Sequence, residues 1–252
     1  MNRASSPTLA TYTSLQRAFD HFNAELFAGE LPDCLITLRS SNRHRGYHQA
    51  NRFVSIEGAM AHELGLNPGF FTLQPIEIVL STLVHEMVHH WQESFGHPTP
   101  SNHHNREWGE KMKSLGLVPT STGLPEGDET GRKVSHYIIS DGAYIQACQR
   151  LVAAGFALPW MDRHAPTEPE KLERVREQLK EQGLAPEFSP PPITVLKEIE
   201  NTAPREQPWI YSPPFKREST RVKFQCPECQ AKAWANEDVE LVCGLCNQIM
   251  RS

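Results

Sequence analysis

The chain has 252 residues, 38% of them hydrophobic, and a formal net charge of -5 at pH 7. This length allows one ordinary hydrophobic core with a small module added to it. The negative net charge excludes a surface coated with basic residues, so any contact with nucleic acid has to come from a local patch. No segment approaches the roughly 18 consecutive apolar residues that span a membrane, and the N-terminus has no apolar run of signal-peptide length. We therefore expect a soluble, cytoplasmic protein without a membrane partner.

The spacing of apolar residues predicts a mixed α+β domain in residues 1–160. Helical periodicity predicts four helices, at residues 14–28, 75–95, 105–115 and 144–154. Runs of β-forming residues predict short strands at residues 34–38 and 52–56, with a further strand around Tyr47. The longest helix has Pro75 in its first turn and stops at Gly96. The stretch between the last two helices is rich in Gly, Thr and Pro, which indicates a loop.

Residues 161–221 have a different composition from the domain before them. Thr167 and Glu170 form a capping box for a charged helix that ends near Gln182. Prolines then crowd residues 186–214. This composition predicts a charged helix followed by a semi-extended, proline-rich linker.

The longest predicted helix carries the run His85-Glu86-Met87-Val88-His89. The two histidines are four residues apart, so their imidazoles share one helical face and can both reach one Zn²⁺. Glu86 lies next to the first histidine, where it can hold a water without being a ligand. On the helical wheel both histidines face away from the apolar stripe, which favours a metal site over ordinary surface or hydrogen-bonded histidines. The run therefore predicts a catalytic zinc site.

A catalytic zinc normally has three protein ligands and an open fourth position. One familiar arrangement, with a glycine three residues and a histidine six residues after the motif, is excluded because Gln92 and Phe95 occupy those positions. The downstream residues able to supply the third ligand are His97, His103, His104, Glu107 and Glu110. The residues alone rank His104 and His103 close together, with Glu110 as the carboxylate alternative.

The last predicted module, residues 222–252, contains two Cys-x-x-Cys pairs. The four cysteines are Cys226, Cys229, Cys243 and Cys246. Two such pairs at this spacing are typical of a four-cysteine zinc ribbon and argue against the alternative of a redox-active pair. We expect a structural zinc, whose binding supplies the folding free energy that so short a module cannot obtain from its core.

Several segments within residues 13–118 match a known family. They are NAELF at residues 23–27, GELP at 29–32, LSTLVHEMVH at 80–89 and HNREW at 104–108. With these segments the chain resembles the SprT-like zinc metalloproteases, the SprT/Spartan group, which includes a protease of proteins crosslinked to DNA. A zinc ribbon also accompanies the protease domain in many bacterial members of this family.

The resemblance implies that His104 is the third zinc ligand, because only His104 has Glu107 and Trp108 at the offsets found in the family. His103 stands where a glycine is usual, so it stays the alternative. The resemblance also implies a compact zincin-like fold, in which the metal helix lies beneath a small sheet and an extended substrate adds to the sheet edge. The cofactors are then two zinc ions, one catalytic and one structural.

We expect a zinc metalloendopeptidase of the His-Glu-x-x-His type. In this hypothesis zinc polarises the scissile carbonyl and lowers the pKa of bound water, while Glu86 takes the water proton and delivers it to the leaving amine. The sequence does not fix the group that stabilises the oxyanion; Tyr47, His48 and His136 are candidates, and each can equally be structural. His90 is expected to be structural rather than a ligand.

Two groups of basic residues could contact phosphates. They are Lys216, Arg217, Arg221 and Lys223 before the ribbon, and Arg39, Arg43, Arg45 and Arg52 near the predicted sheet edge. Each group alone fits a solvated surface, but with the resemblance they lead us to expect DNA-associated protein substrates, single-stranded or damaged DNA as a partner, and a role in DNA repair. The rivals are a transcription regulator that uses the ribbon, and a non-catalytic nucleic-acid-binding or adaptor protein whose first metal site is closed by a fourth ligand such as His103 or Glu110.

Overall fold

The computed structural model describes residues 6–41, 44–71, 74–100, 103–162 and 221–252. Contacts divide the chain into two units, the first within Met1–Tyr211 and the second within Ser212–Ser252, and each is described by itself. The predicted charged helix and proline-rich linker fall at residues 163–220, outside the described residues. The predicted domain boundaries therefore stay predictions.

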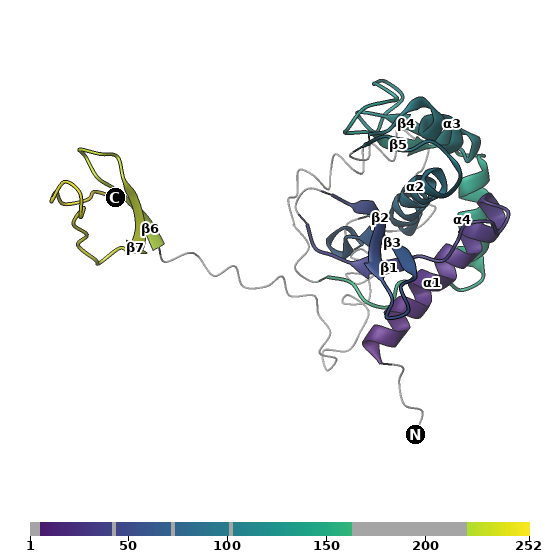
Figure 1. Cartoon of the computed structure of the whole chain (residues 1–252), viewed down its shortest axis with the longest axis horizontal. Helices are drawn as coiled ribbons and strands as arrows, with labels where there is room; N and C mark the ends of the chain where they lie inside the picture. The colour runs from purple at the N-terminus through teal and green to yellow at the C-terminus, as the bar shows by residue number, and fades with distance from the viewer. Residues whose placement is uncertain (1–5, 42–43, 72–73, 101–102, 163–220) are drawn as a thin grey trace, which may run out of the picture. The chain divides into compact units, whose positions relative to one another are not determined.

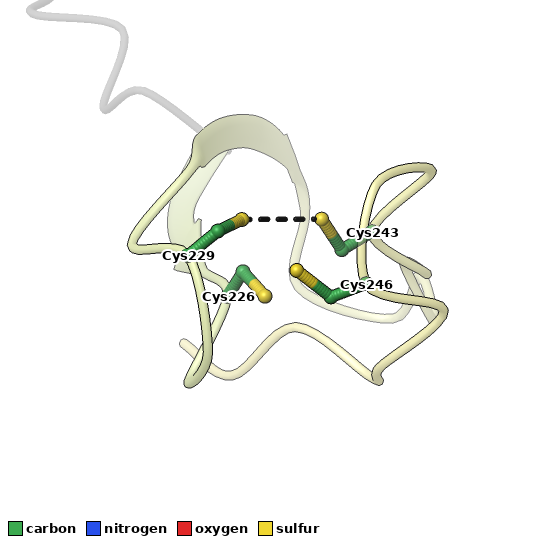
Figure 2. A group of neighbouring side chains, drawn as sticks. All are labelled: Cys226, Cys229, Cys243 and Cys246. Atoms are coloured by element: carbon green, nitrogen blue, oxygen red, sulfur yellow. Dashed lines mark hydrogen bonds between the residues drawn. The ribbon is translucent and has the colours of Figure 1, made fainter.

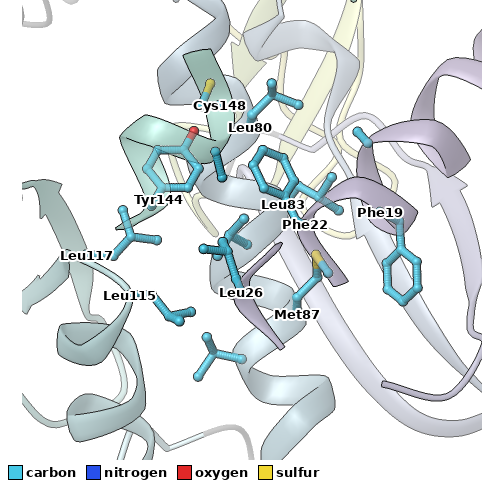
Figure 3. Packing of buried hydrophobic residues seen from close by; sticks show 14 of the residues in the cluster. Phe19, Phe22, Leu26, Leu80, Leu83, Met87, Leu115, Leu117, Tyr144 and Cys148 are labelled. Atoms are coloured by element: carbon cyan, nitrogen blue, oxygen red, sulfur yellow. The ribbon is translucent and has the colours of Figure 1, made fainter. Parts of the chain in front are cut away.

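Three helices contribute much of the hydrophobic core of the first unit (Figures 1 and 3). They are α1 (Pro7–Leu26), α2 (Ile76–Phe95) and α4 (Ala143–Ala153). Phe19 and Phe22 of α1 lie in one buried cluster with Leu83 and Met87 of α2 and with Tyr144 of α4. Because every one of these side chains is at most 1% exposed, α2 is held rigidly along its apolar side.

The predicted helix boundaries are wrong mainly at α1, which begins at Pro7 instead of residue 14. The Ser6 side chain accepts a hydrogen bond from the Leu9 N–H at 3.4 Å, and a proline in the first turn is already in helical geometry. The helix therefore continues for about two turns beyond its apolar stripe, where Leu9 is 62% exposed. At α2, Pro75 is the N-cap residue and Gly96 the C-cap residue.

A three-stranded sheet packs against α2. It contains β1 (Leu35–Leu38), β2 (Gly46–Val54) and β3 (Met60–Leu66) in the order β1-β3-β2, with β1 parallel and β2 antiparallel to β3. The register of β2 shifts between Gln49 and Phe53, where Asn51 has a positive φ of 48°. This bulge joins into one strand the two β regions that the sequence indicated, and β3 was not predicted.

The segment after α2 was also more ordered than predicted. Helix α3 (Arg106–Ser114) leads into β4 (Leu117–Thr120), which pairs with β5 (Ser135–Ile138) in antiparallel register. The sequence indicated a loop here because the stretch is rich in Gly, Thr and Pro. The two strands in it have only four residues each, and β4 contains Pro119, so they left little strand signal. Strand β5 matters for the site because it carries His136.

The second unit is a small two-stranded module. Strands β6 (Arg221–Gln225) and β7 (Lys232–Asn236) pair in antiparallel register. Its buried residues are Phe224, Cys226, Cys243 and Met250. A core of this size cannot offset the loss of chain entropy by itself.

The mixed α+β class is thus confirmed for the described residues, which form small sheets and helices. None of the helices described, the longest of which have 20 residues, combines the length and the apolar character needed to cross a membrane.

Candidate active site

Three histidines converge at one place in the first unit. His85 and His89 lie on α2, and His104 lies just before α3. One ligand nitrogen from each lies within 4.8 Å of the other two. The Trp108 ring packs against all three imidazoles, with centroid distances of 4.8 Å to His85, 5.1 Å to His89 and 4.3 Å to His104. The indole of α3 therefore forms an apolar wall that limits the rotation of all three rings.

A chain of hydrogen bonds fixes the orientation of His85. The Ser81 hydroxyl donates to the Ile78 carbonyl at 2.9 Å, so it accepts from His136 Nε2 at 2.9 Å. The remaining nitrogen of a neutral His136 is then an acceptor for His85 Nδ1, 3.2 Å away. His85 Nδ1 consequently carries the proton, and the lone pair of His85 Nε2 faces the other two histidines.

His104 is held by the backbone of Gly131. The two residues form an isolated β-bridge, with 2.9 Å from the His104 N–H to the Gly131 carbonyl and 3.0 Å in the opposite direction. The same carbonyl lies 2.9 Å from His104 Nδ1, which must be the donor because a carbonyl only accepts. His104 Nε2 therefore has a free lone pair, as a metal-binding histidine with a backbone carbonyl partner does.

These orientations test whether the residues present fit a zinc ion. His104 Nε2 and His85 Nε2 are 3.2 Å apart, and both are acceptors, so the two lone pairs repel each other unless a cation lies between them. Two nitrogens bound at about 2.0–2.1 Å in a tetrahedral site are about 3.3–3.4 Å apart. The donor chemistry and the spacing both fit zinc.

The turn between α2 and α3 sets the distance between the ligands. Gln92 Nε2, on α2, donates to Asn105 Oδ1 at 2.8 Å and to Glu107 Oε2 at 2.7 Å. Asn105 caps α3 by accepting from the Trp108 N–H at 3.0 Å. The side chain of His97 lies 3.0 Å from Glu107 through Nδ1, and the His97 N–H donates to Glu107 at 2.7 Å. These contacts, together with the Gln92 donor, lower the pKa of the Glu107 carboxyl to about 2. This network attaches the start of α3 to the end of α2.

Glu86 lies beside the histidines, under the first residue of β2. Its side chain is buried, and a Cβ atom added at Gly46 would stand 2.9 Å from Glu86 Oε1. Burial raises the pKa of this carboxyl to about 8. Burial also lowers the pKa of His85 and His89 well below the usual value, which keeps both rings in the neutral form that binds metals. A cation bound by the histidines would act in the opposite direction on Glu86 and favour its carboxylate.

The other predicted ligands lie outside this group. Both His103 and Glu110 are exposed, and Glu110 lies 3.8 Å from Lys113. His97 faces Glu107 at 3.0 Å. Among the described residues, the group of metal-ligating side chains around His85 has no fourth member.

The three oxyanion candidates have different surroundings. Tyr47 donates its hydroxyl proton to Glu63 Oε1 at 2.6 Å, and its ring lies across Gly65, where an added Cβ would come within 2.1 Å. His136 orients His85, as described above. His48 is buried and lies 3.3 Å from His62, a residue that the sequence analysis did not single out.

A hollow of about 580 Å³ lies along β2. Its lining includes Gly46, Tyr47 and Gln49 of the strand. Gly46 therefore both lines the hollow and lies over the carboxyl of Glu86. Since β2 is an edge strand of its sheet, an extended chain in this hollow could pair with it.

Comparison with known proteins decides the family. The family model described as "SprT-like family" matches residues 15–127, which include the three histidines and Glu86. A protein of Salmonella typhimurium, described as an uncharacterized protein in the mucB 3' region, is 55% identical over 51 residues, which make up 20% of this chain and 69% of that protein.

The chain belongs to the SprT-like family.

The predicted family is thus confirmed. No solved structure gives a significant match. The SprT-like match ends at residue 127 and so does not include Gly131 and His136, the partners that orient two of the histidines. The match also excludes the second unit.

The second unit of this SprT-like protein brings its four cysteines together. Their sulfurs all lie within 4.8 Å of one another, and Cys229 Sγ is 3.5 Å from Cys243 Sγ (Figure 2). Two equivalent turns present them: the Gln230 N–H donates to the Cys226 carbonyl at 3.1 Å, and the Asn247 N–H donates to the Cys243 carbonyl at 2.8 Å. The set fits a closed, structural zinc site.

Proposed function

We propose that this SprT-like protein is a zinc-dependent metallopeptidase with a zincin-like fold. The observation that carries the proposal is the convergence of oriented imidazole lone pairs from His85 and His104, together with His89, next to the buried carboxyl of Glu86. Three neutral nitrogens leave one position of a tetrahedral ion open, which is the usual arrangement of a catalytic zinc.

Each side chain has a defined task in this proposal. His85, His89 and His104 would hold the zinc, which when bound polarises a carbonyl and acidifies water. Glu86 accepts the proton of the attacking water and delivers it to the nitrogen of the leaving amine. Trp108 and the strand above Glu86 exclude bulk water, which strengthens the electrostatic interactions at the site.

The substrate is proposed to be an extended polypeptide that pairs with β2. The hollow along this strand supports the proposal, since Gly46 connects it to the carboxyl of Glu86. Pairing through main-chain hydrogen bonds would place a peptide bond near the histidines without requiring a particular side chain. Folded proteins lack free extended segments, so unstructured proteins should be the better substrates.

The decisive experiment is the Glu86→Gln variant. Gln keeps the size of the side chain but cannot take up a proton, so we expect unchanged zinc content and a loss of cleavage of about 100-fold or more. Cleavage of an unstructured basic protein is measured with single-stranded DNA present and absent, and metal content is measured by mass spectrometry. Full activity in the zinc-loaded variant would refute Glu86 as the base.

The His104→Ala variant separates metal binding from chemistry. It should bind one zinc ion fewer than the intact chain and lose cleavage, whereas His103→Ala should retain both. If instead His103→Ala loses the ion, the neighbouring residue is the ligand. A non-catalytic adaptor would require a fourth protein ligand, which the described part of the chain does not supply at this site.

We further propose that substrates include proteins associated with DNA. Family membership and basic residues support this proposal: Arg39 lines the hollow beside β2, and Arg221 and Lys223 lie on β6. Arg45 lies over the Phe70 ring, 5.7 Å from its centroid. Arg43, Lys216 and Arg217 lie outside the described residues. Arg52 lies 3.8 Å from Glu63, so part of its charge is already compensated.

Binding to DNA is tested by gel retardation of a single-stranded oligonucleotide at increasing salt. Because the contacts would be made to phosphates, affinity should fall steeply as salt increases, and Lys223→Glu should weaken it. Glu228→Lys adds a positive charge to the same unit, so as a control it should strengthen binding to the oligonucleotide. No retardation at low salt would remove DNA from the proposal and leave the peptidase proposal intact.

A further inference from the structure

A second group of three histidines lies beside the first. His48 is on β2, His62 on β3 and His90 on α2. One nitrogen from each lies within 4.8 Å of the other two. His48 is 4% exposed and His90 is fully buried, while His62 is partly exposed.

The hydrogen bond of His90 fixes the direction of its lone pair. His90 Nε2 lies 2.8 Å from the Pro32 carbonyl, which can only accept, so Nε2 is the donor. In a neutral ring the other nitrogen, Nδ1, is then an acceptor, and it faces His62 Nδ1 at 3.0 Å. This is the arrangement of His104, whose donor nitrogen also bonds a backbone carbonyl.

Hydrogen bonds among the three rings cannot satisfy this geometry. His62 Nδ1 faces both His90 Nδ1 at 3.0 Å and His48 Nε2 at 3.3 Å. A ring nitrogen has either one proton or one lone pair in the ring plane, so it cannot form two well-directed hydrogen bonds. A cation that accepts a lone pair from each ring satisfies all three nitrogens at once.

The spacing also fits a metal ion. Two nitrogens at about 2.0–2.1 Å from one tetrahedral ion are about 3.3–3.4 Å apart, and smaller ligand angles shorten this distance. The separations of 3.0 and 3.3 Å are close to the 3.2 Å between His85 and His104 in the first site. Imidazole is a preferred ligand of Zn²⁺ and related divalent ions.

We propose that His48, His62 and His90 bind a further divalent transition-metal ion, with Zn²⁺ as the natural candidate. The ion joins β2 and β3 to α2 immediately behind the first site. His48 stacks on His89, with ring centroids 6.4 Å apart and an angle of 13° between planes. The ion therefore has a positioning role, since it fixes β2, the strand that covers Glu86, relative to the helix that carries the ligands.

The test counts zinc ions in the full-length chain after dialysis at a low free Zn²⁺ concentration set by a chelator. The intact protein should bind three ions, and His62→Gln should bind two. His21→Gln is the matched control, because His21 is a partly buried histidine that bonds a backbone carbonyl, Ala147, and it should still bind three. Equal zinc content in His62→Gln and the intact protein overturns the proposal.

Cobalt supplies a second readout, which covers the case that His62→Gln is poorly folded. The absorption spectrum of the Co²⁺-loaded variant is subtracted from that of the Co²⁺-loaded intact protein. The difference spectrum should show visible d–d absorption without thiolate charge transfer, because the lost ligands are imidazoles alone. His48→Gln should give the same difference spectrum. A featureless difference spectrum with both variants overturns the proposal. Neither measurement uses cleavage, so the result is independent of the proposed peptidase activity.

Discussion

At the scale of single residues, histidine side chains are positioned by partners far away in the sequence. His85 is oriented by His136, 51 positions later, and His104 by Gly131, 27 positions later. Each partner leaves one particular nitrogen of the ligand unprotonated. Such partners raise the basicity of the ligand and fix its ring, so their loss weakens metal binding even though they do not touch the metal.

His136→Phe should therefore lower zinc affinity about 10- to 100-fold. A planar aromatic ring is kept, but His85 Nδ1 loses its acceptor and the lone pair of Nε2 is no longer held in place. Affinity is measured by competition with a chromophoric chelator. Ser81→Ala, one bond further along the chain of contacts, should have a smaller effect in the same direction. Unchanged affinity in His136→Phe would show that packing alone orients His85.

At the scale of elements, the site depends on the approach of β2 to α2. Gly46 makes this approach possible, because a Cβ there would stand 2.9 Å from both Glu86 Oε1 and Thr82 Cγ2. The bulge around Asn51 bends the strand further along. The position of the Glu86 carboxyl therefore depends on the contact between the strand and the helix.

Gly46→Ala should reduce cleavage about 100-fold while zinc content stays unchanged, because the added methyl displaces the Glu86 carboxyl or lifts the strand by a few tenths of an ångström to about 1 Å. Steady-state kinetics and metal analysis check this result. Gly109→Ala, in α3 of the same unit, is the control, since a Cβ there makes only ordinary contacts, the nearest at 3.8 Å. Full activity of Gly46→Ala would mean that the contact between β2 and Glu86 is dispensable.

At the scale of the whole molecule, the two units are stabilised by different means. The first unit has an extended apolar core that includes residues of α1, α2 and α4. The core of the second unit has four buried residues, two of which are cysteines. A metal ion bound by the four cysteines would therefore supply most of the folding free energy of the second unit, whereas the first unit has its own core.

Removal of all metal with a chelator should consequently unfold the second unit and leave the first folded. Hydrogen exchange followed by mass spectrometry should show loss of protection in residues 221–252, with α1 and α4 still protected. Addition of zinc should restore the protection. Continued protection of residues 221–252 in protein verified to be metal-free would contradict the assignment of a structural zinc there.

The sequence by itself determined the features that depend on local spacing. The i, i+4 spacing places His85 and His89 on one helical face because a helix has 3.6 residues per turn, and the paired cysteines occur within single tight turns. The family and the α+β class also followed from the sequence. Of the third-ligand alternatives, the residues alone could not separate His103 from His104, since both lie in the same short segment.

Only the tertiary structure decided which nitrogen of each histidine faces the site. That choice depends on contacts between segments distant in the chain: Gly131 with His104, His136 with His85, and Pro32 with His90. Strands β3, β4 and β5, the last of which carries His136, were missed because short strands have little periodicity of their own and are stabilised by their neighbours. Hydrogen bonds between distant segments have no signature in local spacing, so the second histidine group could emerge only once the chain was folded.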